Sequence, residues 1–328
     1  MPCPFFFYHG AQITRKAVTN KLAVTPCRSA DTPMELWVIF AVSAAAAQTV
    51  RFAVQKVLAG GQLGPAAATW ARFLYSAPLV AAMVLAYAWA TSQGLPTPPA
   101  KFWPYALLGG VFQILATICT VWLFQLRAFA VGITFKKTEV MLTVLVGLVI
   151  LGDTVSLPGV AAIALGFVGV LLLSEPPEGG SLFNKAAGVG LLSGLFFALS
   201  AVTYRGATLT LDTGDPVLTG GVTLAFVTAW QTLALGIWLR WREPGQISAT
   251  LRTWRTSGLV GLFSLVGSWS WFAAFSLMNA AYVFAVGQIE LIFSLLVGAF
   301  WFRERLRARE LIGMAVLTAS LVAVALVG

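Results

Sequence analysis

Residues 139–153 read EVMLTVLVGLVILGD, and 151 residues further along the chain, residues 290–304 read ELIFSLLVGAFWFRE. Each stretch begins with a glutamate, continues through an apolar run that contains Leu-Val-Gly, and ends in an acidic residue. The same ungapped shift superposes other distinctive residues: Trp103 on Trp254, Gly110 on Gly261, Phe124 on Phe275 and Pro65 on Pro216. Matches of tryptophan, glycine, proline and glutamate in one register indicate an internal duplication.

The duplicated stretches belong to a chain that is too apolar for a water-soluble fold. Hydrophobic residues make up 59% of its 328 residues, charged residues make up 10%, and the mean hydropathy is +0.85. A soluble surface needs roughly a quarter of its residues charged, so this composition places the chain in a lipid bilayer. Because the apolar runs are continuous and do not alternate with polar residues, they predict helices and not barrel strands.

The number of membrane spans follows from the length of these runs, since an α-helix needs about 20 apolar residues to cross ~30 Å of hydrocarbon. The uncharged stretch 256–289 is too long for one helix, and we expect a tight hairpin at Asn279 and Ala280. The sequence then predicts ten transmembrane helices, at residues 36–57, 66–90, 103–126, 130–151, 157–174, 187–207, 216–240, 257–278, 281–302 and 309–327.

These helices form two repeats of five, over residues 34–174 and 187–327. Because each repeat has an odd number of helices, the second is inverted relative to the first. The sequence therefore predicts an all-α integral membrane protein with two inverted five-helix repeats.

Residues 1–33 differ from the rest of the chain. They are polar and carry Arg15, Lys16, Lys21 and Arg28 against a single acidic residue, Asp31. A basic start that is poor in acidic residues is typical of an organelle transit peptide. The interpretation that we favour is that Met34 is the true start, which makes the tail a misassigned or disordered extension. Both interpretations stay open.

Several classes of function are excluded by composition and spacing. The net charge of +9 does not indicate nucleic-acid binding, because the basic residues lie in short gaps between apolar runs, as membrane insertion produces. Cys3, Cys27 and Cys119 have neither disulfide nor metal-site spacing. The sequence carries no phosphate-binding glycine loop and no nucleophile motif, so we expect no metal, no cofactor and no catalytic residue.

Charged side chains inside the predicted spans are the first candidates for substrate binding, since each costs about 2.5–3.5 kcal/mol on insertion scales. Lys136, Glu139 and Thr143 share one face of the fourth span, and Glu290 and Ser294 occupy the matching face of the ninth. A carboxylate that faces the bundle interior can bind a proton, a cation or an amine. The alternative is a structural ion pair near each helix end.

A second polar face lies on the first two spans. Gln48, Arg51 and Gln55 are spaced by three and four residues, Arg72 lies in the second span, and Arg205 occupies nearly the place of Arg51 in the second repeat. Because an unpaired buried charge is costly, we expect the arginines and glutamates to pair. We assign Arg51 and Arg72 to a carboxylate or phosphate group of the substrate. The alternative is that the arginines snorkel to a membrane interface.

Further residues are candidates for lining a cavity, with simple packing as the alternative. These are four aromatic residues and two glutamines: Tyr204, Trp269, Trp271, Tyr282, Gln113 and Gln288.

These features resemble those of the drug/metabolite transporter superfamily, and specifically its EamA-type ten-helix members. The resemblance covers residues 34–327 and rests on the duplicated helices and on the endings of residues 139–153 and 290–304, which look like the family's terminal Gly-Glu-like turn. Such members commonly have proline where Val140 and Leu291 stand here, so a proline kink is not carried over. The resemblance implies helices around a central cavity that opens alternately to the two sides of the membrane.

Membrane orientation stays open. Eight arginines lie in two short loops and favour a cytoplasmic position for those loops, which places both termini outside. They are Arg240, Arg242, Arg252, Arg255, Arg303, Arg305, Arg307 and Arg309. The charges of the tail, Lys101 and the usual arrangement of the resembled family favour the opposite orientation.

We therefore expect a secondary active transporter, an exporter of small organic metabolites that is coupled to protons or to exchange, and not an enzyme. Glu139 and Glu290 are the expected proton or cation sites. A lipid-modifying membrane enzyme and a non-transporting scaffold subunit are the alternatives, and the short loops argue against both. The expected partners are a small-molecule substrate, the lipid bilayer of the cell (inner) membrane and a coupling proton, with a homodimer left open and nucleic acid excluded.

Overall fold

The structure is a computed structural model that describes residues 35–59, 61, 63–123, 125–126, 136–173, 185–293, 296 and 308–327. Within these residues the regular secondary structure is entirely α-helical. The tail at residues 1–33 and the predicted binding residue Ser294 lie outside the described residues.

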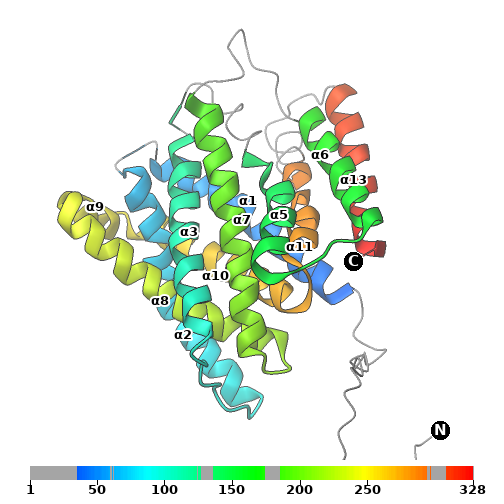
Figure 1. Cartoon of the computed structure of the whole chain (residues 1–328). Helices are drawn as coiled ribbons and strands as arrows, with labels where there is room; N and C mark the ends of the chain where they lie inside the picture. The colour runs from blue at the N-terminus through cyan, green and yellow to red at the C-terminus, as the bar shows by residue number, and fades with distance from the viewer. Residues whose placement is uncertain are drawn as a thin grey trace, which may run out of the picture. The chain divides into compact units, whose positions relative to one another are not determined.

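The described helices follow one another in chain order (Figure 1). Those of the first half are α1 (Glu35–Ala59), α2 (Pro65–Ala90), α3 (Phe102–Leu123), α5 (Glu139–Leu151) and α6 (Leu157–Leu173). Those of the second half are α7 (Lys185–Leu211), α8 (Pro216–Arg242), α9 (Pro244–Arg252), α10 (Trp254–Leu277), α11 (Ala280–Gly287) and α13 (Ala308–Val327).

Six of these helices, α1, α2, α3, α7, α8 and α10, are long and apolar enough to cross a membrane. Shorter apolar helices cover Glu139–Leu151, Leu157–Leu172, Ala280–Phe293 and Leu311–Val327. Each of the ten predicted spans coincides with one of these helices, which supports a multi-pass helical membrane protein. Ten complete spans remain a prediction, because the described apolar stretches of these four helices are shorter than the roughly 20 residues that a span requires.

Prolines that match in the two repeats both begin a helix. Pro65 opens α2 and Pro216 opens α8, where the fixed backbone angle of proline suits the first helical turn. The start of α8 is also capped, since the Asp215 carboxylate accepts hydrogen bonds from the backbone N–H groups of Val217 at 2.8 Å and Leu218 at 3.3 Å.

The hairpin expected at Asn279 and Ala280 is confirmed. Met278 has an extended backbone and ends α10, and the Asn279 side chain accepts a hydrogen bond from the Ala281 N–H at 2.9 Å, which caps α11. The long uncharged stretch is therefore divided into two helices by a side-chain cap.

One helix was not predicted from the sequence. α9 is a short amphipathic helix between α8 and α10, in the arginine-rich connection that we had interpreted as a loop. Pro244 opens it, Thr250 is its one buried residue, and Arg252 lies in its last turn. A search for runs of about 20 apolar residues cannot detect a helix of this length and polarity.

Helices of one repeat pack mainly against helices of the other. α3 packs along α7, and α1 packs along α10. The counterpart of α3 in the second repeat is α10, and the counterpart of α7 in the first repeat is α1, so the two-fold relation converts one pair into the other. α2 likewise packs on α8, and α6 packs on α13, as Figure 1 shows for the last pair. This exchange of partners is the pattern that a two-fold relation between the repeats produces.

Candidate functional site

Charged and amide side chains from both repeats meet in the interior of the helix bundle. We call this set the central polar cluster: Gln48, Arg51, Arg72, Lys136, Lys137, Glu139, Gln288 and Glu290. Arg51 and Arg72 are only 2% and 3% exposed, and Lys136 and Lys137 are 2% and 3% exposed. The side chains of Arg51 and Arg72 are therefore enclosed by the helix bundle and do not extend along its outer surface.

The turn before α5 places one lysine beside one glutamate. Lys136 Nζ lies 3.2 Å from Glu139 Oε2, and Glu139 occupies the first turn of α5, where the helix dipole favours a carboxylate. The turn can approach α7 closely because Gly194 has no side chain; a methyl group at that position would lie 2.7 Å from the Lys136 carbonyl oxygen. The Thr143 hydroxyl donates to the Glu139 carbonyl oxygen at 2.6 Å, so it braces the helix and does not line the site.

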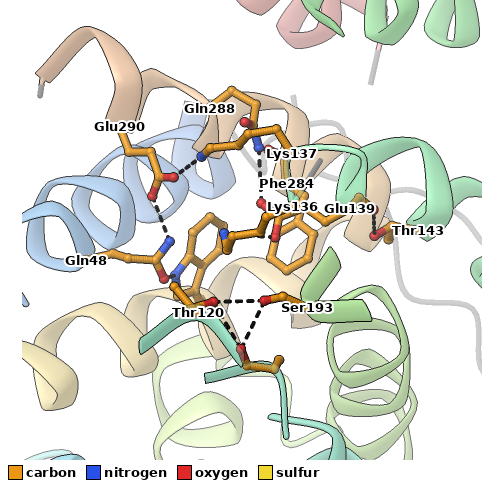
Figure 2. Close-up of polar contacts among 12 residues, drawn as sticks. Gln48, Thr120, Lys136, Lys137, Glu139, Thr143, Ser193, Phe284, Gln288 and Glu290 are labelled. Carbon is orange, nitrogen blue, oxygen red and sulfur yellow. Dashed lines mark hydrogen bonds and ion pairs between the residues drawn. The ribbon is translucent and has the colours of Figure 1, made fainter. Parts of the chain in front are cut away.

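The second glutamate is held by residues of the first repeat, as Figure 2 shows. Lys137 Nζ forms an ion pair with Glu290 Oε1, and Gln48 Nε2 donates to Glu290 Oε2 at 2.8 Å. Lys137 was not among the binding residues predicted from the sequence, although its charge lies in the fourth predicted span. Its neighbour Lys136 shares the helical face of Glu139, whereas Lys137 lies off that face, so helical spacing alone does not indicate its role.

The expected direct pairing of arginine with glutamate is wrong for Arg51. Its guanidinium donates to Gln55 Oε1 at 3.1 Å and to Gln48 Oε1 at 3.2 Å. Because the Gln48 amide also donates to Glu290, it bridges the cation and the carboxylate. Gln55 is fixed in turn by a hydrogen bond from its amide to the Ala68 carbonyl oxygen at 3.1 Å, so it supports Arg51 from behind.

Arg72 lies between the two repeats. It donates to Thr117 Oγ1 at 3.3 Å and to Ser268 Oγ at 2.9 Å. These two hydroxyls are equivalent in the 151-residue register, since Thr117 on α3 matches Ser268 on α10. One guanidinium therefore contacts both halves of the duplicated structure through uncharged groups.

The central polar cluster has an excess of positive charge. The ion pairs within the described residues are Lys136–Glu139, Lys137–Glu290 and Arg205–Asp153, and neither Arg51 nor Arg72 takes part in one. The cluster thus holds four cationic groups against two carboxylates. Buried charge without a counter-ion is costly, which favours binding of an anion at this place.

Arg205 is not part of this cluster, although its sequence position resembles that of Arg51. Arg205 Nε lies 2.7 Å from Asp153 Oδ2, and its Nη1 donates to the carbonyl oxygens of Phe275 and Met278 at 2.9 and 2.7 Å. A cation that satisfies the last carbonyl groups of α10 stabilises the end of that helix. For Arg205 the structural interpretation is therefore the better one.

Two narrow, enclosed cavities adjoin the cluster. The first is lined by Lys136, Glu139, Gln288 and Glu290, and the second by Arg72, Gln113, Tyr204 and Ser268. Both are also lined by the same four residues, which lie between them: Gln48, Phe197, Trp271 and Phe284. Of the predicted binding residues, Gln48, Arg72, Lys136, Glu139 and Glu290 therefore reach a cavity, whereas Arg51, Gln55 and Thr143 do not line either one.

The further candidates divide in the same way. Tyr204, Trp271, Gln113 and Gln288 line the cavities. Trp269 donates from its indole to the Val217 carbonyl oxygen at 2.8 Å and so joins α10 to α8. The Tyr282 hydroxyl contacts the backbone N–H and the side chain of Ser156, just before α6. Trp269 and Tyr282 therefore have packing roles.

A wider groove lies elsewhere, between α2, α3 and α8. Its walls are mainly apolar and include Ile114, Ile118, Leu235 and Trp238. It shares no residue with the central polar cluster, and its lining includes Gln125 and Glu243 but no cationic group that would bind an anionic metabolite. The chemistry therefore favours the narrow cavities over the wider groove as the functional site.

Comparison with known proteins agrees with this architecture. The model of the EamA-like transporter family matches twice, over residues 35–175 and 184–326, once in each half of the duplication. A solved structure described only as "Crystal structure of protein" is similar with a TM-score of 0.65 at 13% sequence identity, covering 88% of this chain and 97% of that chain, which shows a shared fold. No curated protein sequence matches. The resemblance inferred from the sequence is confirmed, and the chain belongs to the EamA-like transporter family.

Proposed function

We propose that the protein is a secondary active transporter of small organic anions and that the central polar cluster binds them. One observation carries this proposal: four buried cationic side chains lie with one buried and one half-buried carboxylate, and within the described part of the chain Arg51 and Arg72 have only uncharged hydrogen-bond partners. A carboxylate or phosphate group of a substrate would supply the missing counter-charge. Arg72 lines a cavity and is well suited to bind either group, whereas Arg51 lies behind Gln48 and adds positive charge to the site.

Alternating access is the mechanism that we propose for transport. The exchange of packing partners between the repeats supports an inverted two-fold arrangement of five helices each, with the cluster at the interface of the repeats. The ion pair between Lys137 and Glu290 joins the two repeats directly. Rocking of one repeat against the other would change the access to the cluster from one side of the membrane to the other.

Glu139 and Glu290 are the groups that we propose for coupling. Each contacts a lysine and an amide in the cluster, so a change in protonation of the carboxylate alters the net charge that an anionic substrate meets. Export coupled to protons or to exchange uses this link. The rival functions are a lipid-modifying enzyme and a scaffold subunit, and membership of a transporter family favours neither.

Transport by the purified protein in liposomes tests the proposal. We would measure counterflow of labelled carboxylates, phosphate esters and amines at several pH values, for the wild type and for Glu139→Gln combined with Glu290→Gln. The exposed Asp212, changed to asparagine, serves as a control for removal of one negative charge. We expect counterflow of anions and a loss of its pH dependence in the glutamate variant. Unchanged transport and pH dependence in that variant would remove the coupling role.

A further inference from the structure

The second cavity has an aromatic wall that the proposed function does not explain. Ser268, Trp271, Phe272 and Phe275 are spaced by three, one and three residues, so they share one face of α10. All four line the second cavity, and Phe272 and Phe275 are 1% and 2% exposed. The face therefore presents a hydroxyl group followed by three aromatic rings.

The Ser268 hydroxyl lies beside the guanidinium group of Arg72. Arg72 donates to Ser268 Oγ at 2.9 Å, and both residues line the cavity together with Gln113. One helical turn further along α10, the cavity is bounded by Trp271 and Phe272. A guanidinium and an aromatic wall thus lie next to one another in a single cavity, at a separation set by one turn of helix.

Most of the rings that bound the cavity contact one another in stacked or edge-to-face geometries, which aromatic groups prefer. Tyr204 and Phe272 have centroids 4.4 Å apart, and Trp271 and Phe275 are nearly parallel, with centroids 5.9 Å apart. Phe284 meets Trp271 and Phe275 edge-on, at 5.3 and 5.6 Å. A planar guest that separates these rings can replace the contacts that they lose, whereas a saturated ring offers only apolar burial.

The aromatic wall does not follow from the duplication. The positions of α3 that match Trp271 and Phe272 are Thr120 and Val121. Thr120 exchanges a hydrogen bond with Ser193 at 2.8 Å and so serves helix packing. The same helical face is therefore polar and aliphatic in one repeat and aromatic in the other, which gives the cavity two chemically different sides.

The charges that line the second cavity indicate whether it suits an aromatic anion, an aromatic amine or an aromatic zwitterion. An ammonium group in the second cavity would meet Arg72, and the two carboxylates of the cluster already contact Lys136 and Lys137. A carboxylate, in contrast, would add a charged hydrogen-bond partner to a guanidinium whose partners among the described residues are two hydroxyl groups. The second cavity thus favours a group with a net negative charge.

We infer that the substrates are aromatic monocarboxylates, with the carboxylate on Arg72 and the ring against Trp271, Phe272 and Phe275. This inference rests on the proposed function and specifies its substrate class. It requires the aromatic side chains to separate when the substrate enters, because the cavity is narrow and enclosed. Rearrangement at the interface of the repeats during alternating access provides that opening.

A set of matched compounds tests this inference by calorimetric titration of the detergent-purified protein. The compounds are 3-phenylpropionate, 3-cyclohexylpropionate, propionate and 2-phenylethylamine. We expect 3-phenylpropionate to bind roughly fivefold more tightly than 3-cyclohexylpropionate, which corresponds to the usual contribution of an aromatic contact beyond area burial. Propionate should bind more weakly than either, and 2-phenylethylamine should not compete.

Two variants and one control assign the effect to the cavity. Phe272→Leu should remove the preference for the phenyl ring over the cyclohexyl ring, and Arg72→Gln should weaken binding of both carboxylates at least about tenfold. Phe226→Leu, on the exposed side of α8, should leave all affinities unchanged. Melting temperatures without ligand show whether each variant is folded, and a variant that unfolds is replaced by Phe275→Leu or Arg72→Lys.

The outcomes separate this inference from the proposed function. Equal affinities for 3-phenylpropionate and 3-cyclohexylpropionate would overturn the aromatic assignment and leave an anion transporter. Binding of 2-phenylethylamine in place of the carboxylates would overturn both the inference and the proposal of an anion site. If none of the carboxylates bound, the inference would be overturned. The counterflow measurement with phosphate esters would then decide whether the proposed function stands.

Discussion

Lys137 and Gln288 occupy equivalent positions in the two repeats, and each contacts the glutamate of the other repeat. Lys137 Nζ pairs with Glu290 Oε1, and Gln288 Nε2 lies 3.5 Å from Glu139 Oε1. Because Glu139 and Glu290 are themselves equivalent, the two contacts exchange under the two-fold relation of the repeats. Only one of them is an ion pair, so the halves of the cluster are alike in geometry and different in charge.

The ion pair between Lys137 and Glu290 should couple the two repeats energetically. We expect Lys137→Gln and Glu290→Gln each to lower the melting temperature of the purified protein. Removal of one partner of a fully buried pair costs about 3–5 kcal/mol when the other stays charged, and the loss here should be smaller because Glu290 is only half-buried. The double variant should be less destabilised than the sum of the single variants. Additive effects in this double-mutant cycle would show that the pair does not act as a unit.

Gln48 should control the affinity for anions because it contacts both Arg51 and Glu290. In Gln48→Glu the side chain keeps its length, gives Arg51 a carboxylate partner and replaces the amide donor of Glu290 with a second carboxylate, so it adds negative charge to the cluster. We expect roughly tenfold weaker binding of a carboxylate, about 1.4 kcal/mol, as measured by titration calorimetry. Gln246→Glu, a peripheral change that retains the acceptor for the Gly64 N–H, is the control and should have no effect. Undiminished affinity in Gln48→Glu would contradict the charge argument.

The close approach of α7 to the turn that carries Lys136 and Glu139 should depend on Gly194. A methyl group there would lie 2.7 Å from the Lys136 carbonyl oxygen and 3.3 Å from the Glu139 nitrogen. We expect Gly194→Ala to cost about 1–3 kcal/mol and to lower the melting temperature. Gly188→Ala on the same helix meets nothing within 4 Å and should be neutral or slightly stabilising. Equal melting temperatures for the two variants would argue against this packing.

The cap of α8 should make the stability of the protein depend on pH in the acidic range. Partial burial raises the pKa of the Asp215 carboxyl, but hydrogen bonds from Tyr87, Leu218, Val217 and Gln93 outweigh this effect and hold the pKa below its ordinary value. A carboxyl with a lowered pKa contributes stability above its unfolded pKa and loses that contribution as the pH falls through the folded pKa.

Asp215→Ala should therefore cost about 1 kcal/mol at neutral pH, as loss of a helix cap does. The difference in melting temperature from the wild type should shrink as acid protonates the wild-type carboxyl. Asp212→Asn, an exposed change in the same connection, is the control. A difference that stays constant into strong acid would mean that the charge of Asp215 does not contribute to the cap.

The sequence alone predicted the apolar helices and the residues that are buried among them. Local composition determines where about 20 apolar residues follow one another, and the cost of charge in a membrane singles out Arg51, Arg72, Lys136 and Glu139. The duplication could be read in the same way, because matched prolines, tryptophans and glutamates lie in one ungapped register.

The contacts between these residues could not be predicted from the sequence. Lys137 reaches Glu290 because helices of one repeat pack against those of the other. The spacing of residues around Lys137 gives no information about that packing. The same holds for Gln48, whose amide separates Arg51 from Glu290, and for Arg205, whose partner Asp153 follows the end of α5. Spacing along a helix identifies a shared face, but the opposing residues depend on tertiary packing.

Counterflow of a labelled carboxylate into proteoliposomes tests the central claim most directly, with the wild type beside a variant in which Arg51→Gln and Arg72→Gln are combined. If the excess positive charge of the central polar cluster binds the substrate, the wild type accumulates the label. The folded variant then has an initial rate of uptake that is at least about tenfold lower than that of the wild type. Transport by the folded variant at the wild-type rate would contradict the account.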